Sequence, residues 1–549
     1  MDNNIKQANA RKSDVSLFFS GVLILTVANI LVKAVGLVTK IALNRVVESV
    51  GAGYYSSAYE IYAYLYVIST AGLPVALSIM VAKSRASGRF NEAKKIFNIA
   101  MAVFLTIGFV FSTLMIAFSN GIASFIGSEE TSLCIVAIAP TILFICLSSC
   151  MRGYFQGYQQ MSQTAISQFI EAVCKVGVGV ALAVWAKSRG YDDFVVAAYT
   201  ILGVTVGVFL GMVFLYIRKL FFKEERYNAL LDVPVDTECK KTKPLLKELF
   251  AIAIPITISS SVLSLTTIID TLMVQNRLLS AGMDPTTVKV LYGDYATLVI
   301  SMFNLPTILL YPMVNALVPL ISAARARKDK EGEERMRSFS VRFIMLLALP
   351  CALGLGVFSS PILDLLMFRK DSVERAAPWL SIAAVSVVFL GIIAVTNAFL
   401  NTAGRQKLPI ISMIAGASVK LISNYFLIGS IGMYGAPIST VLCYLCASSL
   451  NIFFTVKYVG KLPDLKNVFV FPLLSSALAV GGAAGVYLLL SRLILPKIAT
   501  VIAIVAAVVF YAFFIGRTGS VKQDEIEMLP NGSKISNLLI KLKILPQKK

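Results

Sequence analysis

The 549-residue sequence contains no histidine, and this absence limits the chemistry available to it. Without imidazole there is no histidine proton relay, no histidine metal ligand and no Ser-His-Asp triad. The phosphate-loop pattern GxxxxGK[ST] is missing as well, which excludes ATP hydrolysis by that route. Since no other constellation indicates an enzyme, we expect neither catalytic residues, nor a cofactor, nor a bound metal.

Charged residues are also scarce, at 15% of the chain, whereas 57% is hydrophobic and the mean hydropathy is +0.78. A soluble protein of this length needs far more polar surface, so the composition indicates an all-α polytopic membrane protein. Runs long enough to span a bilayer, about 20 residues each, predict about fourteen helices. We expect them at 15–43, 53–82, 96–119, 131–151, 163–186, 194–217, 246–273, 290–322, 340–367, 377–402, 408–430, 433–457, 467–491 and 496–516.

Acidic residues are few: 30 Asp and Glu stand against 50 Lys and Arg, for a net charge of +20. If both termini are cytoplasmic, most of the Lys and Arg fall in inner segments such as "KSRASGRFNEAKK" (83–95) and "ARARKDKEGEERMR" (324–337). This is the positive-inside asymmetry that orients membrane helices. The basic balance therefore needs no nucleic-acid partner, and the first apolar run is expected to be a retained helix, not a cleaved signal.

The eight cysteines do not indicate a metal or redox site. "CYLC" (443–446) has the spacing of such a pair, but it lies in an apolar run without other ligands nearby. Free cysteines in that setting behave as small buried residues.

The longest polar interruption predicts the domain organisation. A cytoplasmic linker (218–245) separates an N-lobe (1–217, helices 1–6) from a C-lobe (246–460, helices 7–12), followed by two further helices (461–516) and a basic cytoplasmic tail (517–549). The lobes resemble each other where "QGYQQMSQTAISQFIEAVCK" aligns with "NTAGRQKLPIISMIAGASVK", through the pairs Ile166/Ile411, Ser167/Ser412, Ala172/Ala417 and Lys175/Lys420. Parallel repeats that enclose a mid-membrane cavity are typical of alternating-access transporters.

Ionisable residues inside the spans are the candidate functional site, because such residues face a bundle interior or a water-filled cavity. Basic groups outnumber acidic ones in the deepest set, which favours an anionic ligand such as a diphosphate. The candidates for the diphosphate cavity are Lys33, Lys40, Arg152, Lys175 and Lys420. The candidate charge partners or gating residues are Glu60, Glu171, Asp270, Asp294 and Asn424.

Spacing suggests partners for some of these charges. Glu171 and Lys175 are four residues apart with the acid first, which favours an ion pair on one helix face. Lys420 has no such acid, because Gly416 occupies the place of Glu171 in the second lobe. Its possible partners are Asp270, Asn424 or a bound ligand.

Several stretches resemble a known family. "FSGVLILTVANILVKAVGLVTKIALNRVV", "RGYFQGYQQMSQTAISQFIEAV" and "LLALPCALGLGVFSSPI" are similar to the MurJ/SpoVB-like branch of the multidrug/oligosaccharidyl-lipid/polysaccharide (MOP) flippase superfamily. The likeness runs from about residue 17 to 516. It implies two six-helix lobes, a lipid-tail groove formed by the last two helices, and a plasma-membrane flippase for an undecaprenyl-diphosphate-linked glycan, most plausibly the peptidoglycan precursor lipid II.

The resemblance also assigns residues. Lys33 corresponds to a basic residue midway along the first helix, and "YGD" supplies Asp294. The basic residue that usually follows that Asp is replaced by Tyr295, so the cavity carries its charge differently. Asp270 fits a sodium-binding position of some members, but Lys420 falls where an acid would help, and an Asp270–Lys420 pair is our preferred alternative.

Three alternatives stay open. One is a flippase for another lipid-linked glycan, such as a capsule, teichoic or spore-envelope precursor. The second is a cation-coupled multidrug antiporter, which would predict an acidic cavity. The third is a non-transporting scaffold for envelope enzymes, which would not need a central lysine. For the flippase, the candidate partners are the lipid-linked glycan, membrane lipids and cell-wall synthesis enzymes.

Overall fold

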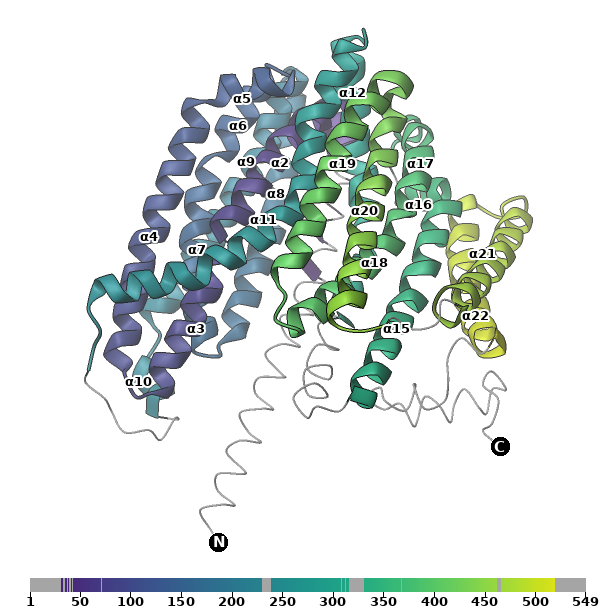
Figure 1. Ribbon diagram of the computed structural model, residues 1–549. Coiled ribbons are helices and arrows are strands. Elements are labelled where there is room, and N and C mark those ends of the chain that lie inside the picture. Colours follow the sequence, from purple (N-terminus) through teal and green to yellow (C-terminus); the bar gives the residue numbers. More distant parts are fainter. Residues whose placement is uncertain are drawn as a thin grey trace. The chain divides into compact units, whose positions relative to one another are not determined.

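The computed structural model describes residues 31–518, apart from 33–34, 37, 39–40, 42, 71, 230–237, 308, 312, 315–329, 367 and 462–465. All regular structure in this described part is helical, which confirms the predicted all-α class (Figure 1). By its contacts the chain divides into two compact units, Met1–Gly293 and Asp294–Lys549.

The first unit contains long helices joined by short turns at both ends. Its elements are η1 (Leu43–Val47), α2 (Glu48–Thr70), α3 (Leu73–Ala86), α4 (Phe90–Ala117), α5 (Ser119–Ile126), α6 (Thr131–Ile138), α7 (Pro140–Gly157), α8 (Met161–Ser188), α9 (Asp193–Leu220), α10 (Glu224–Ala229), α11 (Thr242–Ser280) and α12 (Pro285–Asp294). Its core is a continuous apolar cluster to which α2, α3, α4, α6 and α9 all contribute.

The second unit begins at the end of α12. Its elements are η2 (Tyr295–Val299), α13 (Ile300–Phe303), α15 (Lys330–Val357), α16 (Ser359–Leu365), α17 (Lys370–Ala384), α18 (Ser386–Thr402), α19 (Lys407–Ile431), η3 (Gly432–Tyr434), α20 (Gly435–Tyr458), η4 (Lys466–Val470), α21 (Phe471–Leu490) and α22 (Pro496–Thr518).

Ten helical stretches of the described residues are long and apolar enough to cross a membrane. The sequence predicts about fourteen, and the two numbers differ for identifiable reasons. Lys407–Tyr458 is one continuous stretch that covers two expected helices. The expected helix 246–273 lies in α11, which is not among the ten, and the expected helices at 15–43 and 290–322 fall partly on residues outside the described set.

Prolines interrupt some spans and not others. The expected span 53–82 is divided into α2 and α3, and Pro74 lies in the first turn of α3, where its missing N–H costs nothing. The expected span 131–151 is likewise divided before Pro140, the first residue of α7. Pro350, by contrast, lies inside the continuous helix α15. A proline in these spans is therefore not by itself a helix boundary.

Helix α11 packs against α2 and α3 of the first unit. The sequence assigns this helix to the C-lobe, because the 218–245 linker precedes it. The two divisions use different criteria: the lobes follow the sequence repeat, and the units follow contacts. The repeat-based lobes stay a prediction.

The predicted repeat aligns part of α8 with part of α19, and each of these helices packs against the long helix that follows it, α9 or α20. Both helix pairs have a close crossing that depends on glycine. A Cβ atom on Gly207 of α9 would lie 2.7 Å from the carbonyl oxygen of Glu171, and one on Gly416 of α19 would lie 2.6 Å from the carbonyl oxygen of Cys443. Because the backbones touch here, long side chains of α8 must leave the crossing and reach toward other helices.

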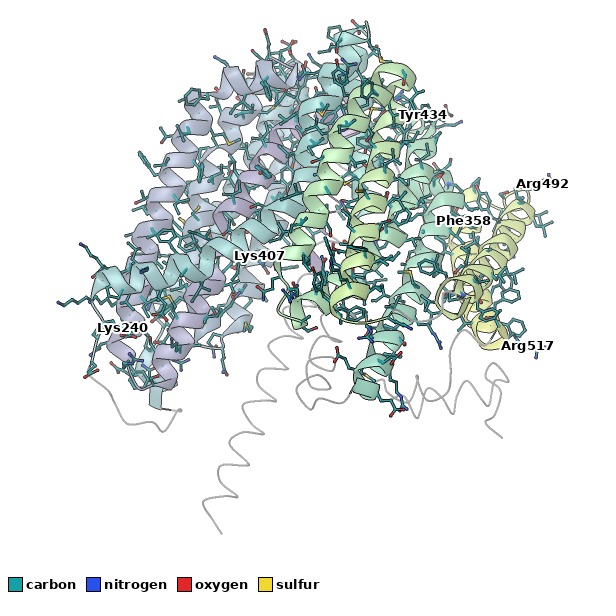
Figure 2. All side chains as sticks on the ribbon, viewed as in Figure 1. Lys240, Phe358, Lys407, Tyr434, Arg492 and Arg517 are labelled. Carbon is teal, nitrogen blue, oxygen red and sulfur yellow. The ribbon has the colours of Figure 1, made fainter. Side chains whose placement is uncertain are left out.

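The hairpin α21–α22 contacts the rest of its unit through a small cluster, Phe358, Val480, Ala483 and Ala503. Figure 2 labels Arg492 in the turn of the hairpin and Arg517 near its end. Between these cations the hairpin exposes many large apolar side chains, among them Leu478, Val505 and Val508. Such a surface is suited to lipid; the lipid-tail groove predicted here stays a prediction.

Candidate functional site

An ion pair joins α7 to α8 within a membrane-spanning part of the first unit. Arg152 on α7 donates through Nη2 to Oε2 of Glu171 at 2.9 Å and through Nε to Oγ of Ser167 at 3.0 Å. The Arg152 side chain is 7% exposed and that of Glu171 24%. A guanidinium that donates to two acceptors on one helix face is held in a defined orientation.

Lys175 lies one turn further along α8 and reaches α2. Its Nζ donates to the hydroxyl of Tyr59 at 3.1 Å and lies 4.3 Å from the centroid of the same ring. The lysine is half-buried. A hydrogen bond and a cation–π contact with one tyrosine hold the ammonium group in place.

The partner of Glu171 therefore differs from the one that the sequence predicts. The i,i+4 rule gives Lys175, but the structure places the guanidinium of Arg152 against the carboxylate and the ammonium of Lys175 on Tyr59. A neighbouring helix offers a planar, multiply bonded donor, which outcompetes a single lysine on the same helix. Sequence reasoning missed Tyr59 and Ser167, although the regular tyrosine spacing of α2 is a readable signal.

Other predicted residues are less fully defined. Lys33 and Lys40 lie outside the described residues. Glu60 is half-buried on α2, next in sequence to Tyr59. Asp270 is buried on α11, at 2% exposure.

The second unit buries the lysine of the second repeat. Lys420 is 2% exposed and Asn424, one turn on, is fully buried, both on α19. They share the face of α19 that carries Gly416 and Ser412. The predicted Asp270–Lys420 pair would join residues of two separate units and stays a prediction.

Asp294 has a cationic partner that the sequence does not indicate. Nε of Arg375, on α17, donates to its carboxylate at 2.7 Å, and Nη2 of the same arginine lies 3.5 Å from Asp371. Asp294 is fully buried and Arg375 partly exposed. The positive charge expected next to Asp294 in sequence, where Tyr295 stands, is thus supplied by a later helix.

A second polar cluster attaches α12 to the first turns of α2 in the first unit. Lys289 donates to the hydroxyl of Tyr54 at 2.7 Å and to Glu130 at 2.8 Å. The hydrogen bond from Lys289 lowers the pKa of Glu130. Burial alone would lower the pKa of Lys289, but the bonds to Glu130 and Tyr54 outweigh it and raise that pKa. The backbones are close here as well, since a Cβ on Gly53 would lie 2.5 Å from the carbonyl oxygen of Lys289.

A third cluster surrounds Glu224 on α10. Its carboxylate accepts hydrogen bonds from Lys219 and from the hydroxyl of Tyr154, the latter at 2.6 Å, and lies 3.3 Å from Nζ of Lys94. Burial would raise the pKa of Glu224, but the bonds from Lys219 and Tyr154 lower it. These contacts attach the start of the predicted linker to α4, α7 and α9.

The end of that linker is attached too. The backbone N–H of Lys240, labelled in Figure 2, donates to Glu92 of α4 at 2.9 Å, and its ammonium lies 3.2 Å from Glu248 of α11. Among the described residues no group of His, Cys, Asp or Glu is arranged to hold a metal ion.

Comparison with known proteins places this architecture in a class. Solved structures with the same fold include the lipid II flippase MurJ in an inward closed conformation (TM-score 0.67, 14% identity, covering 90% of this chain and 98% of that one). They also include an inward-facing multidrug transporter of the MATE family (TM-score 0.59, 14% identity, covering 76% and 97%). The chain therefore has the fold of these transporters.

The family follows from the sequence match. Residues 18–325 match the family described as polysaccharide biosynthesis protein, and the chain belongs to that family. Residues 255–426 also match the MatE family.

Relatives from Bacillus subtilis (strain 168) span most of the chain. They include the membrane protein YabM, 24% identical over 534 residues (95% of this chain, 96% of the relative). Stage V sporulation protein B is 26% identical over 433 residues (77% and 80%), and the lipid II flippase MurJ is 24% identical over 463 residues (80% and 83%). The chain is thus a multi-pass membrane protein related to flippases.

Proposed function

We propose that this chain is a flippase that moves lipid II, an undecaprenyl-diphosphate-linked peptidoglycan precursor, from the inner to the outer leaflet by alternating access. The observation that carries the proposal is half-buried Lys175, held on Tyr59 beside the Arg152–Glu171 pair. A lysine held inside a membrane-spanning bundle by an uncharged partner suits an anionic cargo. The likeness to relatives that include a lipid II flippase supports the choice of cargo.

The residues take different parts in this proposal. Arg152 is already paired with Glu171, whereas Lys175 contacts the uncharged Tyr59, so Lys175 is our first candidate to bind a phosphate. Lysine binds phosphate as a point charge, and a diphosphate needs several of them; Lys33, Lys40 and Lys420 are the further candidates. The polyprenyl tail stays in lipid beside α21 and α22, and both termini lie in the cytoplasm.

Flipping a lipid changes no covalent bond. We therefore expect the charge of the site and the access of the cargo to it, not catalytic groups, to limit the rate of transport. Removing Lys175 should therefore abolish transport without unfolding the protein. Lys187 offers a matched control, because it lies on the same helix, pairs with Glu48 and is well exposed.

Genetic complementation tests the proposal. A bacterium depleted of its resident lipid II flippase would receive the parent, K175A, K175R or K187A as its only copy. We expect rescue by the parent and K187A, partial rescue by K175R and none by K175A at equal expression. Rescue by K175A would remove Lys175 from the mechanism, and failure of a well-expressed parent would contradict lipid II as cargo.

A flippase for another lipid-linked polysaccharide is the second candidate. The family description, polysaccharide biosynthesis protein, and the likeness to stage V sporulation protein B both favour it over an unrelated cargo. Vesicle assays with several undecaprenyl-diphosphate-linked glycans would separate it from the first. The MatE match makes drug efflux worth measuring beside them, and cation-coupled efflux of drugs would support the antiporter alternative.

A further inference from the structure

Four tyrosines form a continuous stripe along α2. Tyr55, Tyr59, Tyr62 and Tyr66 follow one another at spacings of four, three and four residues, which places them on one face of the helix. Successive ring centroids are 5.8, 5.8 and 6.0 Å apart. At 1.5 Å per residue the tyrosine stripe is about 16 Å long.

The position of the tyrosine stripe argues against simple packing. Tyrosine in membrane proteins gathers at the two interfaces, where its hydroxyl reaches water. This stripe instead runs along the inside of a candidate span, Asn44–Arg85. Phenylalanine or leucine would fill the same volume without a hydroxyl that must be satisfied. Four hydroxyl-bearing rings in a row therefore indicate a surface with a polar task.

Exposure divides the stripe into two kinds of residue. Tyr55 and Tyr62 are buried, at 2% and 5%, and belong to the apolar core of the unit. Tyr59 and Tyr66 are half-buried. These two lie seven residues, or about 10 Å, apart along the helix. The buried pair belongs to the core, and each residue of the half-buried pair packs against the core and keeps part of its surface exposed.

The candidate phosphate site lies at the second tyrosine of the stripe. Nζ of Lys175 lies 4.3 Å from the ring centroid of Tyr59 and donates to its hydroxyl. In a polyprenyl-diphosphate glycan the first sugar is bonded directly to the diphosphate. A phosphate held at Lys175 therefore brings the first sugar next to Tyr59 and the following one toward Tyr66.

We propose that Tyr59 and Tyr66 bind the sugar part of the cargo, so that the tyrosine stripe makes the protein selective for glycan-bearing lipids; this rests on the proposed function. A sugar ring has an apolar C–H face that packs on an aromatic ring, and hydroxyl groups that exchange hydrogen bonds with a phenol. Rigid aromatic rings combined with a few polar groups are the usual composition of a small-molecule site. A sugar-free lipid diphosphate would contact the lysines and gain nothing from Tyr66.

Binding of two lipids separates the sugar contact from the phosphate contact. The full-length protein in nanodiscs would be titrated with undecaprenyl diphosphate and with undecaprenyl-diphosphate-linked disaccharide-pentapeptide. Tyr66 is the residue to change, because Tyr59 also positions Lys175. We expect Y66L to weaken binding of the glycan lipid about five- to tenfold and to leave binding of undecaprenyl diphosphate unchanged.

Two further variants make the result specific. Y66F keeps the ring and should retain most of the affinity, and Y64L, on the same helix but outside the stripe, should bind both lipids as the parent does. A thermal unfolding midpoint equal to that of the parent shows that Y66L is folded. If Y66L binds both lipids as tightly as the parent does, or loses affinity for both to the same extent, the sugar contact is overturned.

The outcomes also separate this inference from the proposed function. A parent that binds the sugar-free lipid through Lys175 and gains nothing from the glycan overturns the role of the stripe and leaves a diphosphate-binding flippase standing. A parent that binds neither lipid overturns both.

Discussion

Arg152 and Glu171, on adjacent helices, form an ion pair with 2.9 Å between Nη2 and Oε2, and the arginine is almost fully buried. Removing one member of a buried pair leaves the other charge without compensation, which is more costly than removing both. The pair also keeps a strong cation next to Lys175 neutral. It is therefore a structural element that sets the net charge of the candidate site.

The first prediction concerns the stability of this pair. We expect R152M to lower the free energy of unfolding by about 2–4 kcal/mol and E171Q by somewhat less, because Glu171 is partly exposed. The double variant R152M/E171Q should cost less than the sum of the two. Thermal unfolding in detergent of the parent, the two single variants and the double variant completes a double-mutant cycle. Strictly additive losses of stability would contradict the coupling.

The second prediction concerns Tyr59 as the group that positions Lys175. Y59F removes the hydroxyl that accepts from Nζ but keeps the ring and its cation–π contact. A net hydrogen bond to a charged group contributes about 1.5–3 kcal/mol and a desolvated cation–π contact up to about 2 kcal/mol. We therefore expect Y59F to retain partial transport and Y59L to lose nearly all of it.

Transport of fluorescent lipid II into vesicles by Y59F, Y59L and K175A checks this order. If Lys175 acts independently of Tyr59, both tyrosine variants would transport as the parent does. The double variant Y59L/K175A gives the control. If the two residues act at one site, it should transport no less than K175A alone.

Sequence predicts the helices of this chain well and their side-chain partners poorly. The expected span 194–217 appears as α9, Asp193–Leu220, because a long apolar run bounded by charges has few other solutions in a membrane. Partners depend on which helices become neighbours. Lys175 finds Tyr59 across 116 positions, a relationship that no local spacing rule contains.

Asp294 illustrates the same limit. Tyr295 replaces the basic residue that usually follows this Asp, and the sequence does not indicate which cation takes its place; Arg375 reaches Asp294 from α17, 81 positions away. The i,i+4 rule failed for Glu171 for the opposite reason. It predicts Lys175 on the same helix as the partner, while Arg152 on the neighbouring helix is the better donor. Regular spacing of one residue type, as in the tyrosine stripe, is the kind of signal that sequence does carry.

The third prediction concerns pH and the Lys289–Glu130 contact. The pKa of Glu130 is lowered in the folded protein, so its contribution to stability is present above the unfolded value of about 4.5. It is lost as the pH falls through the folded pKa. The pKa of Lys289 is raised, so its contribution is present below about 10.5 and is lost as the pH rises through the folded pKa.

Unfolding midpoints of the parent and E130Q between about pH 3 and 7 test the acid side of this window. Glu130 is half exposed, so the difference at neutral pH should be only about 0.5–1 kcal/mol. It should shrink toward zero at the acid end. A difference that does not change with pH would mean that the carboxylate charge of Glu130 plays no part in fastening α12.

The fourth prediction concerns Lys420, the counterpart of Lys175 in the second repeat. Lys420 is buried at 2% exposure in α19, and a lysine at the centre of a membrane helix costs about 2.5–3.5 kcal/mol on insertion scales. If Lys420 is present because it binds the cargo, K420M should abolish transport. Its unfolding midpoint should stay unchanged or rise, since methionine fills a similar volume. K407M, on the exposed start of the same helix, is the matched control and should transport normally.

A structural role for Lys420 gives a different pattern. If the lysine neutralises a buried acid, K420M leaves that acid uncompensated and should lower stability by about 3–5 kcal/mol, and a second change at Asp270 should restore it. Comparing K420M, D270N and the double variant for both transport and unfolding therefore distinguishes a lysine held for a diphosphate from one held for Asp270. Normal transport by K420M at equal expression would exclude Lys420 from the mechanism altogether, and the positive charge of the cavity would then rest on Lys175 and the lysines of the first helix.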